Sequence, residues 1–144
     1  MAPHIVETGE FAGWRIWPDD PFEQTAGPFY MRDGAEGPEM AFRLERKHLN
    51  GMGSVHGGCL MSFADFALFG IAHEALKPSG YGITVAFTSE FLAGAREGAL
   101  MEARGETLRA GGSLIFVRGV ITADGIPCLN FSGTLKRLRE RAGS

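Results

Sequence analysis

The spacing of hydrophobic and polar positions changes once along this chain, near residue 80. Residues 57–76 are apolar at nearly every position, and an all-round apolar helix of this length is typical of a buried one. From Ile83 to Phe91 apolar and polar residues alternate, which predicts a strand, and residues 100–108 alternate more weakly. Residues 114–121 are largely apolar on both faces, so we expect this strand to be central.

Turn signals separate these segments. Lys77-Pro78-Ser79-Gly80 ends the helix, and hairpin turns are predicted at Ala110-Gly111-Gly112 and at Asp124-Gly125. The remaining predicted elements are two short strands near 29–32 and 40–44, a turn segment at 33–38 between them, and a last strand over 128–138 that ends in a solvated basic tail (Lys136, Arg137, Arg139, Arg141). With one or two helices and five or six strands in consecutive hairpins, the pattern predicts an α+β fold whose sheet curves around the helix.

The first 24 residues contain an aromatic cluster, Phe11, Trp14 and Trp17, at a spacing of three. This spacing predicts a short helical or irregular lid that packs on the main body. The breakers Pro18-Asp19-Asp20-Pro21 are expected to end it.

Composition narrows the class of protein. The chain has 144 residues, 44% hydrophobic and 22% charged, which indicates one globular domain. The net charge of −3 supplies no basic field for nucleic acid. The N-terminus lacks the features of a signal peptide, and Asp65 and His73-Glu74 interrupt the longest apolar run, so we expect a cytoplasmic protein that does not span a membrane.

The two cysteines and four histidines do not suggest a metal site or a disulfide framework. Cys59 and Cys128 lie in apolar runs and are expected to be reduced core residues. No pair of histidines has a metal-ligand spacing, so no metal is predicted.

The start of the long helix is the first candidate site. Gly57 and Gly58 leave the first backbone N–H groups unshielded, which favours an oxygen that carries negative charge, although they could simply begin a helix. His56 precedes them and has either a structural role in the loop or a catalytic one. Asn50, in an Asn-Gly dipeptide, either stabilises a turn or orients a water or a substrate.

The second candidate is Asp65, a carboxylate in the apolar helix. If the side chain is buried, one alternative is that the backbone or Ser62 donates hydrogen bonds to the carboxylate. The other alternative is that Asp65 is a general base or nucleophile whose pKa is raised by desolvation. Cys59 and Ser62 are poor candidates for the nucleophile because no histidine stands in a triad-like order with them.

Gly57 and Asp65 are eight positions apart on one predicted helix. At a rise of ~1.5 Å per residue, the offset is roughly 12 Å, too far for both to act on one carbonyl carbon. If both act on one substrate, Asp65 must come from a second copy of the chain, in a two-fold dimer with antiparallel helices.

These residues carry a family resemblance. The pattern Asn50-x5-His56-Gly57-Gly58-x6-Asp65 resembles the signature of the PaaI-like hotdog-fold thioesterases, the group that includes thioesterase superfamily member 2. The resemblance covers about residues 26–136. It implies a single hotdog domain over 1–144, with a core of about 26–138, an N-terminal aromatic extension over 1–25, and a five- to six-stranded antiparallel sheet around one long helix.

The resemblance also implies an activity and its residues. The reaction is hydrolysis of an acyl-CoA thioester at the interface of a homodimer or dimer of dimers, without a cofactor, since coenzyme A is part of the substrate. Gly57 N–H would polarise the thioester carbonyl, and His56 would support that loop. Asn50 would orient the water or the thioester, Asp65 of the partner subunit would act as base or nucleophile, and Thr84 would assist it.

Three further residues are implied in binding the substrate or coenzyme A: Gly58, Phe91 and Arg109. The guanidinium of Arg109, beside a glycine turn, suits a phosphate, but the residue could equally be a solvated turn residue. Aromatic and methionine side chains of the helix and the next strand could form an acyl pocket or plain core.

Two other activities fit the same fold. A non-hydrolytic acyl-CoA-binding module is the main alternative, and the complete set of Asn50, His56 and Asp65 argues against it. An enoyl-CoA hydratase is disfavoured because no separate Asp/His pair suits hydration. The sequence does not identify the acyl group.

Overall fold

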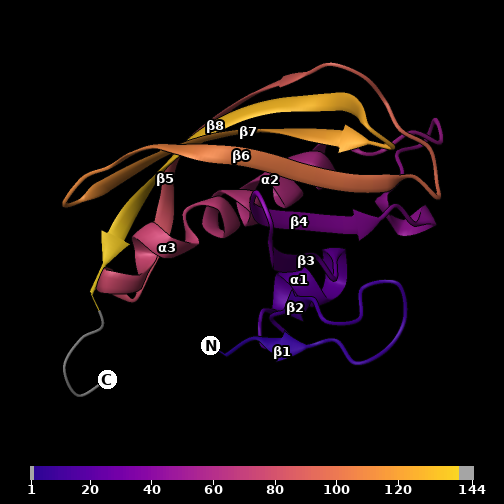
Figure 1. The fold of residues 1–144 in the computed structure, drawn as a ribbon. Coiled ribbons are helices and arrows are strands. Elements are labelled where there is room, and N and C mark those ends of the chain that lie inside the picture. The colour runs from indigo at the N-terminus through magenta and orange to yellow at the C-terminus, as the bar shows by residue number, and fades with distance from the viewer. Residues whose placement is uncertain (1, 140–144) are drawn as a thin grey trace.

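The computed structural model describes residues 2–139 and consists of one curved antiparallel sheet and a long central helix (Figure 1). The elements, in chain order, are β1 (His4–Ile5), β2 (Arg15–Ile16), α1 (Pro21–Ala26), β3 (Tyr30–Gly34), β4 (Gly37–Arg43), η1 (Arg46–His48), α2 (Gly57–Ile71), α3 (His73–Leu76), η2 (Lys77–Ser79), β5 (Tyr81–Phe91), β6 (Leu100–Ala110), β7 (Leu114–Ala123) and β8 (Ile126–Leu138).

The sheet has the order β1-β2-β3-β4-β6-β7-β8-β5. Figure 1 shows β6, β7 and β8 arching over α2, while β4 to β1 continue below the helix. The predicted α+β architecture is therefore confirmed, but two details differ. The sheet has eight strands because β1 and β2 extend it. The strands are not all consecutive hairpins, since β5 pairs with β8 at the edge rather than with its neighbour in sequence.

The core lies between α2 and the inner face of the sheet. Side chains from both layers are fully buried there, including Phe63 and Leu68 of α2 and Ile121 and Phe131 of the sheet. Gly133 allows the close approach, because a Cβ at this position would come within 2.4 Å of the Leu68 side chain. The helix is thus held at a fixed depth against β8.

The predicted helix over 57–76 is interrupted. It ends as α2 at Ile71, and the segment that follows, His73–Ser79, turns away by 65°. Within residues 2–139 no single helix is long and apolar enough to span a membrane, and this bent pair meets the criterion only when its two parts are taken together.

The expectation that α2 is buried on all sides is wrong. Gly58, Met61 and Asp65 are exposed in the single chain, and their spacing of three and four places them on one stripe of the helix. The sheet covers the opposite face of α2. The apolar composition had suggested burial within one chain, but this stripe is left uncovered.

The N-terminal segment also differs from the prediction. Residues 4–5 and 15–16 are short strands at the sheet edge, and the helix α1 follows the breakers instead of preceding them. Asp20 caps this helix by accepting the Glu23 N–H at 3.0 Å, and Pro21 occupies its first position. Trp14 is buried against Phe11, with the two ring centroids 5.4 Å apart.

The other strands and turns follow the prediction closely. Strand β7 lies between β6 and β8, as expected for a central strand. Asp124 and Gly125 both have positive φ, which suits the tight β7–β8 hairpin. Arg137 is not solvated as expected: its guanidinium donates to the Gly111 and Ala75 carbonyls. Of the predicted basic tail, Arg141 lies outside the described residues.

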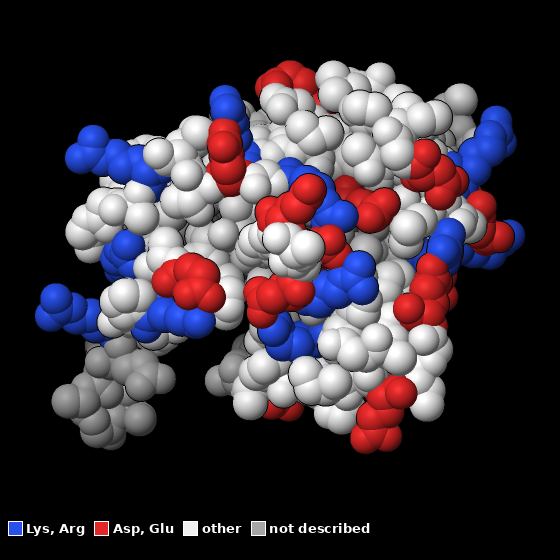
Figure 2. Space-filling model, in the orientation of Figure 1, with Lys and Arg blue, Asp and Glu red and all other residues white. Residues whose placement is uncertain are grey.

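Charged side chains of both signs are interspersed on the surface (Figure 2). One such group joins β3, β4 and β6, where Glu39 contacts both Arg32 and Arg104. Among the described residues, no three His, Cys, Asp or Glu side chains come together as a metal-binding group. Both cysteines are free thiols; Cys128 is buried and Cys59 half-buried.

Candidate active site

The start of α2 presents one backbone N–H group without an intramolecular partner. His56 is the N-cap: its Nδ1 accepts the Gly58 N–H at 2.8 Å, and its carbonyl accepts the Cys59 and Leu60 N–H groups. The Gly57 N–H has no acceptor among residues 2–139. It also lies at the positive end of the helix dipole, so the arrangement favours an oxygen with negative charge at Gly57.

The hydrogen bond from Gly58 also identifies the tautomer of a neutral His56 ring. Because Nδ1 accepts a hydrogen bond, the neutral ring carries its proton on Nε2. The histidine therefore holds the loop and the helix start together. This contact corresponds to the structural alternative that the sequence offered for His56. Gly58 is exposed, but its N–H is already engaged by His56.

Phe91, at the end of β5, covers Gly57 within the same chain. A Cβ at Gly57 would come within 3.1 Å of the Phe91 ring, so a larger residue here would require the ring to shift by a few tenths of an ångström. The ring remains 56% exposed. The structure thus brings together three residues predicted for the site: His56, Gly57 and Phe91.

Asn50 lies at the start of a tight loop that leads into His56. Its Oδ1 accepts the Met52 and Ser54 N–H groups at 2.8 and 3.1 Å, and a bridge between Leu49 and Val55 closes the loop. The turn-forming role is confirmed. The Nδ2 group of Asn50 makes no hydrogen bond to the described residues, so it is free to donate to another molecule.

Asp65 and Thr84 form a second group, halfway along α2. The Thr84 hydroxyl donates to Asp65 Oδ1 at 2.6 Å, which is at the short end of the range for hydrogen bonds between oxygen atoms. A β-bulge between Thr84 and Ala86 turns the strand at this point. Ser62 does not satisfy the aspartate, because its hydroxyl donates to the Gly58 carbonyl.

The two groups do not meet within one chain. Gly57 and Asp65 are both on α2, so the offset of roughly 12 Å along its axis applies. Arg109 is farther away. It precedes the β6–β7 turn. Hydrogen bonds from Arg137 connect this turn to α3, which follows the C-terminal end of α2. Arg109 is exposed, and its role in binding stays a prediction.

Two residues near the site were missed by sequence reasoning. His48 is buried; its ring donates to the Ala26 carbonyl at 2.7 Å and accepts the Glu45 N–H, and burial lowers its pKa. Glu23 is half-buried near Asp65. Burial, with the charges of Asp20 and Asp65, raises the pKa of Glu23 to about 7. The Asp20-Pro21-x-Glu23 pattern signals a capped helix start, but nothing local in it indicates a contact with α2.

The thiol of Cys59 is unsuited to nucleophilic attack. Burial raises the pKa of Cys59 to about 11, so the reactive thiolate is scarce at neutral pH. This agrees with its low ranking as a nucleophile.

Known proteins resemble this chain both in sequence and in fold. The sequence profile of the Thioesterase superfamily matches residues 52–128, just over half of the chain. A Pseudomonas aeruginosa protein that is provisionally named an esterase is 28% identical over 102 residues, which cover 70% of this chain and 76% of that protein.

Solved structures confirm the expected hotdog fold. The PaaI protein of the Escherichia coli phenylacetic acid degradation operon superposes with a TM-score of 0.70 at 20% identity, and covers 83% of this chain and 86% of its own. A hypothetical thioesterase from Streptococcus pneumoniae, solved with coenzyme A, gives 0.67 at 18% identity, with 79% and 88% covered.

Proposed function

Because this chain belongs to the thioesterase superfamily, we propose that it hydrolyses the thioester of an aryl- or medium- to long-chain acyl-CoA to the free acid and CoA. The observation that carries the proposal is the Gly57 N–H: the N–H groups of Gly58, Cys59 and Leu60 have acceptors, whereas this one has none among residues 2–139. Such a donor suits a carbonyl oxygen that becomes negatively charged.

The proposed reaction uses water, the Gly57 backbone N–H and the Asp65 side chain. The thioester carbonyl oxygen accepts the Gly57 N–H, and the water oxygen bonds to the carbonyl carbon while its proton passes to Asp65. The carbon–sulfur bond then breaks, and the departing CoA thiolate takes up a proton. In the alternative version an Asp65 carboxylate oxygen attacks the carbonyl carbon and displaces the CoA thiolate, and water then hydrolyses the resulting anhydride to the free acid and restores Asp65.

The proposed active unit is a homodimer, or a dimer of dimers, with shared sites. Strand β5 is an edge strand eleven residues long on which Ile83 and Val85 are exposed, and Met61 of α2 is exposed as well. Proteins normally cover so long and apolar an edge. Two-fold pairing with antiparallel helices centred near Met61 would bring Gly57 of one protomer to Asp65 of the partner subunit.

The other site residues have supporting roles in this proposal. Asn50 Nδ2 orients the water or the thioester, and the Thr84 hydroxyl holds Asp65 in place. Phe91, Gly58 and Arg109 contact the substrate or coenzyme A. The coenzyme A in the pneumococcal structure supports this class of ligand.

The test is thiol release from a panel of aryl- and acyl-CoA substrates, together with calorimetric binding of a thioether analogue that cannot be hydrolysed. The proposal expects turnover of at least one thioester. Tight binding of the analogue without turnover of any substrate would instead indicate the non-hydrolytic acyl-CoA-binding module. If the protein neither binds the analogue nor hydrolyses any substrate, both the thioesterase and the binding-module hypotheses are contradicted.

A further inference from the structure

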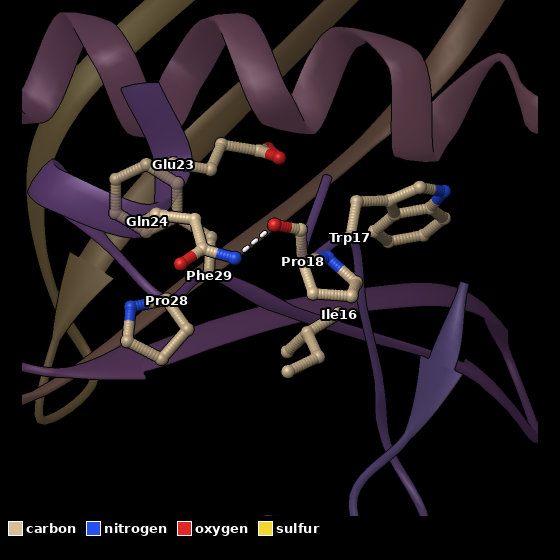
Figure 3. Close-up of a pocket in the computed structure, with 7 residues that line it drawn as sticks. All are labelled: Ile16, Trp17, Pro18, Glu23, Gln24, Pro28 and Phe29. Carbon is tan, nitrogen blue, oxygen red and sulfur yellow. Dashed lines mark hydrogen bonds between the residues drawn. The ribbon is translucent and has the colours of Figure 1, made fainter. Parts of the chain in front are cut away.

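A cavity of about 180 Å³ lies among residues 16–29 of the N-terminal part of the chain (Figure 3). Its walls are mostly apolar, formed by Trp17 and Pro18 on one side and Pro28 and Phe29 on the other. Glu23 and Gln24 of α1 also line it. All of these residues precede residue 52, where the match to the family begins. Its lining therefore combines the N-terminal extension, which carries Trp17, Pro18, Glu23 and Gln24, with Pro28 and Phe29 at the start of the expected hotdog core.

The cavity adjoins the helical turn that carries Asp65. Trp17 and Phe29 both contact Phe66, the next residue, with ring centroids 5.8 and 5.6 Å apart. Figure 3 shows the Glu23 carboxyl group extending beneath α2. An acyl group whose carbonyl carbon is next to Asp65 can therefore extend toward this cavity in the subunit that supplies the aspartate.

One polar group in the cavity wall has no partner. The Gln24 side chain donates to the Pro18 carbonyl, but the Glu23 carboxyl group accepts no hydrogen bond from residues 2–139. Burial is the main cause that raises its pKa to about 7, and the charges of Asp20 and Asp65 add to it. Glu23 therefore changes charge near neutral pH, in a wall with two further carboxylates close by.

We propose that this cavity receives the distal end of the acyl group, that Trp17 limits its length, and that Glu23 excludes acyl ends with a carboxylate. The inference rests on the proposed thioesterase function and specifies its substrate as an uncharged acyl group of limited size. An apolar cavity of roughly 150 Å³ holds benzene, so this one has room for about six carbons. A terminal carboxylate would be repelled by the nearby acidic groups.

Chain length is tested with a series of straight-chain acyl-CoA substrates. The wild-type kcat/KM should decline beyond about six to eight carbons, and Trp17→Leu should raise kcat/KM for the ten- and twelve-carbon substrates at least fivefold relative to hexanoyl-CoA. The matched control is Trp14→Leu, since Trp14 packs against Phe11 instead of the cavity. If Trp14→Leu does not fold, Phe22→Ala, an exposed residue of α1, replaces it. An unchanged chain-length profile in Trp17→Leu contradicts the proposal.

Charge selectivity is tested with adipyl-CoA against hexanoyl-CoA between pH 6 and 8. The wild type should prefer hexanoyl-CoA, and the preference should increase several-fold as pH rises through about 7, because Glu23 then ionises. Glu23→Gln should weaken the preference and make it independent of pH. A pH-dependent preference that survives in Glu23→Gln overturns the role of Glu23.

A binding measurement that does not require turnover distinguishes the cavity proposal from the thioesterase proposal on which it rests. The chain has two tryptophans, so Trp17→Leu assigns the Trp17 indole N–H signal by NMR. Hexan-1-ol should shift the Trp17 signal and leave the Trp14 signal in place. If thioesters are hydrolysed but hexan-1-ol leaves Trp17 unaffected, the cavity proposal is wrong and the function stands. If hexan-1-ol shifts Trp17 while no thioester is hydrolysed, the cavity binds apolar ligands and the thioesterase proposal is wrong.

Discussion

The start of α2 and its middle are built in different ways, although they are parts of one helix. At the start, backbone and side-chain hydrogen bonds satisfy the N–H groups of Gly58, Cys59 and Leu60, and the Gly57 N–H has no acceptor in the part of the chain that the structure describes. This arrangement is complete within one chain, since His56 and Phe91 come from the same protomer.

The middle of the helix instead presents a side chain, the Asp65 carboxylate. Asp65 is exposed and has one described partner, the Thr84 hydroxyl of the edge strand β5. A carboxylate at a free edge can serve a site in a neighbouring chain, whereas a donor at a capped helix start is ready to bind without one. The comparison suggests that the donor site is pre-formed and that the carboxylate becomes functional on assembly.

The largest effect is expected from removing the carboxylate. Asp65→Asn keeps the shape of the side chain and its contact with Thr84 but removes the base, so kcat for thiol release should fall about 10²–10⁴-fold. Binding of the thioether analogue should change little, because the donor at Gly57 remains. A loss of less than about threefold in kcat would contradict the assigned role.

The next effect concerns the donor. Gly57 is the first residue of α2, where proline is well tolerated, and His56 already has the extended backbone that a following proline requires (φ −68°, ψ 132°). Gly57→Pro should therefore fold but lose about 10²–10³-fold in kcat, since one oxyanion donor is missing. Circular dichroism verifies the fold. Wild-type kcat in the folded variant would show that the N–H is not used.

A smaller effect is expected at Thr84. Thr84→Val removes the hydrogen bond to Asp65 and should reduce kcat by about 10- to 150-fold, which corresponds to about 1.5–3 kcal/mol for a hydrogen bond to a charged group. Thr84→Ser keeps the hydroxyl and is the matched control, expected to retain most of the activity. Equal losses in both variants would indicate packing at the bulge as the cause.

The smallest effect concerns the stability of the helix start. His56→Ala removes the N-cap acceptor of Gly58 and should cost about 0.5–2 kcal/mol. This corresponds to a decrease of about 2–6 °C in Tm. His56→Ser restores a cap acceptor and should recover most of that loss in thermal unfolding. Full recovery of Tm together with wild-type kcat in His56→Ser would confirm that the histidine has a structural role only.

Local patterns were sufficient to predict much of this molecule. The alternation in 83–91 and the Asp124-Gly125 turn depend on neighbouring residues, and both agree with the structure. The helix start was also predictable, because His56 and the two glycines are consecutive and their roles follow from helix-end geometry.

Features that depend on distant parts of the chain were not predictable in this way. The exposure of Asp65 results from how much of α2 the sheet covers, which the apolar composition of the helix does not reveal. Glu23 approaches Asp65 only in the folded chain, and the 41 residues between them carry no signal of that proximity. The edge position of β5 likewise arises from its long-range pairing with β8.

The most direct test of the shared site is to mix the two inactive variants. Asp65→Asn and Gly57→Pro subunits, once exchanged, should form mixed dimers with one intact site and one doubly damaged site. With random exchange about half of the dimers are mixed, so about a quarter of the wild-type thiol-release activity should return. If no activity returns after native mass spectrometry has verified exchange between folded variants, one chain supplies the whole site and the shared-site account is wrong.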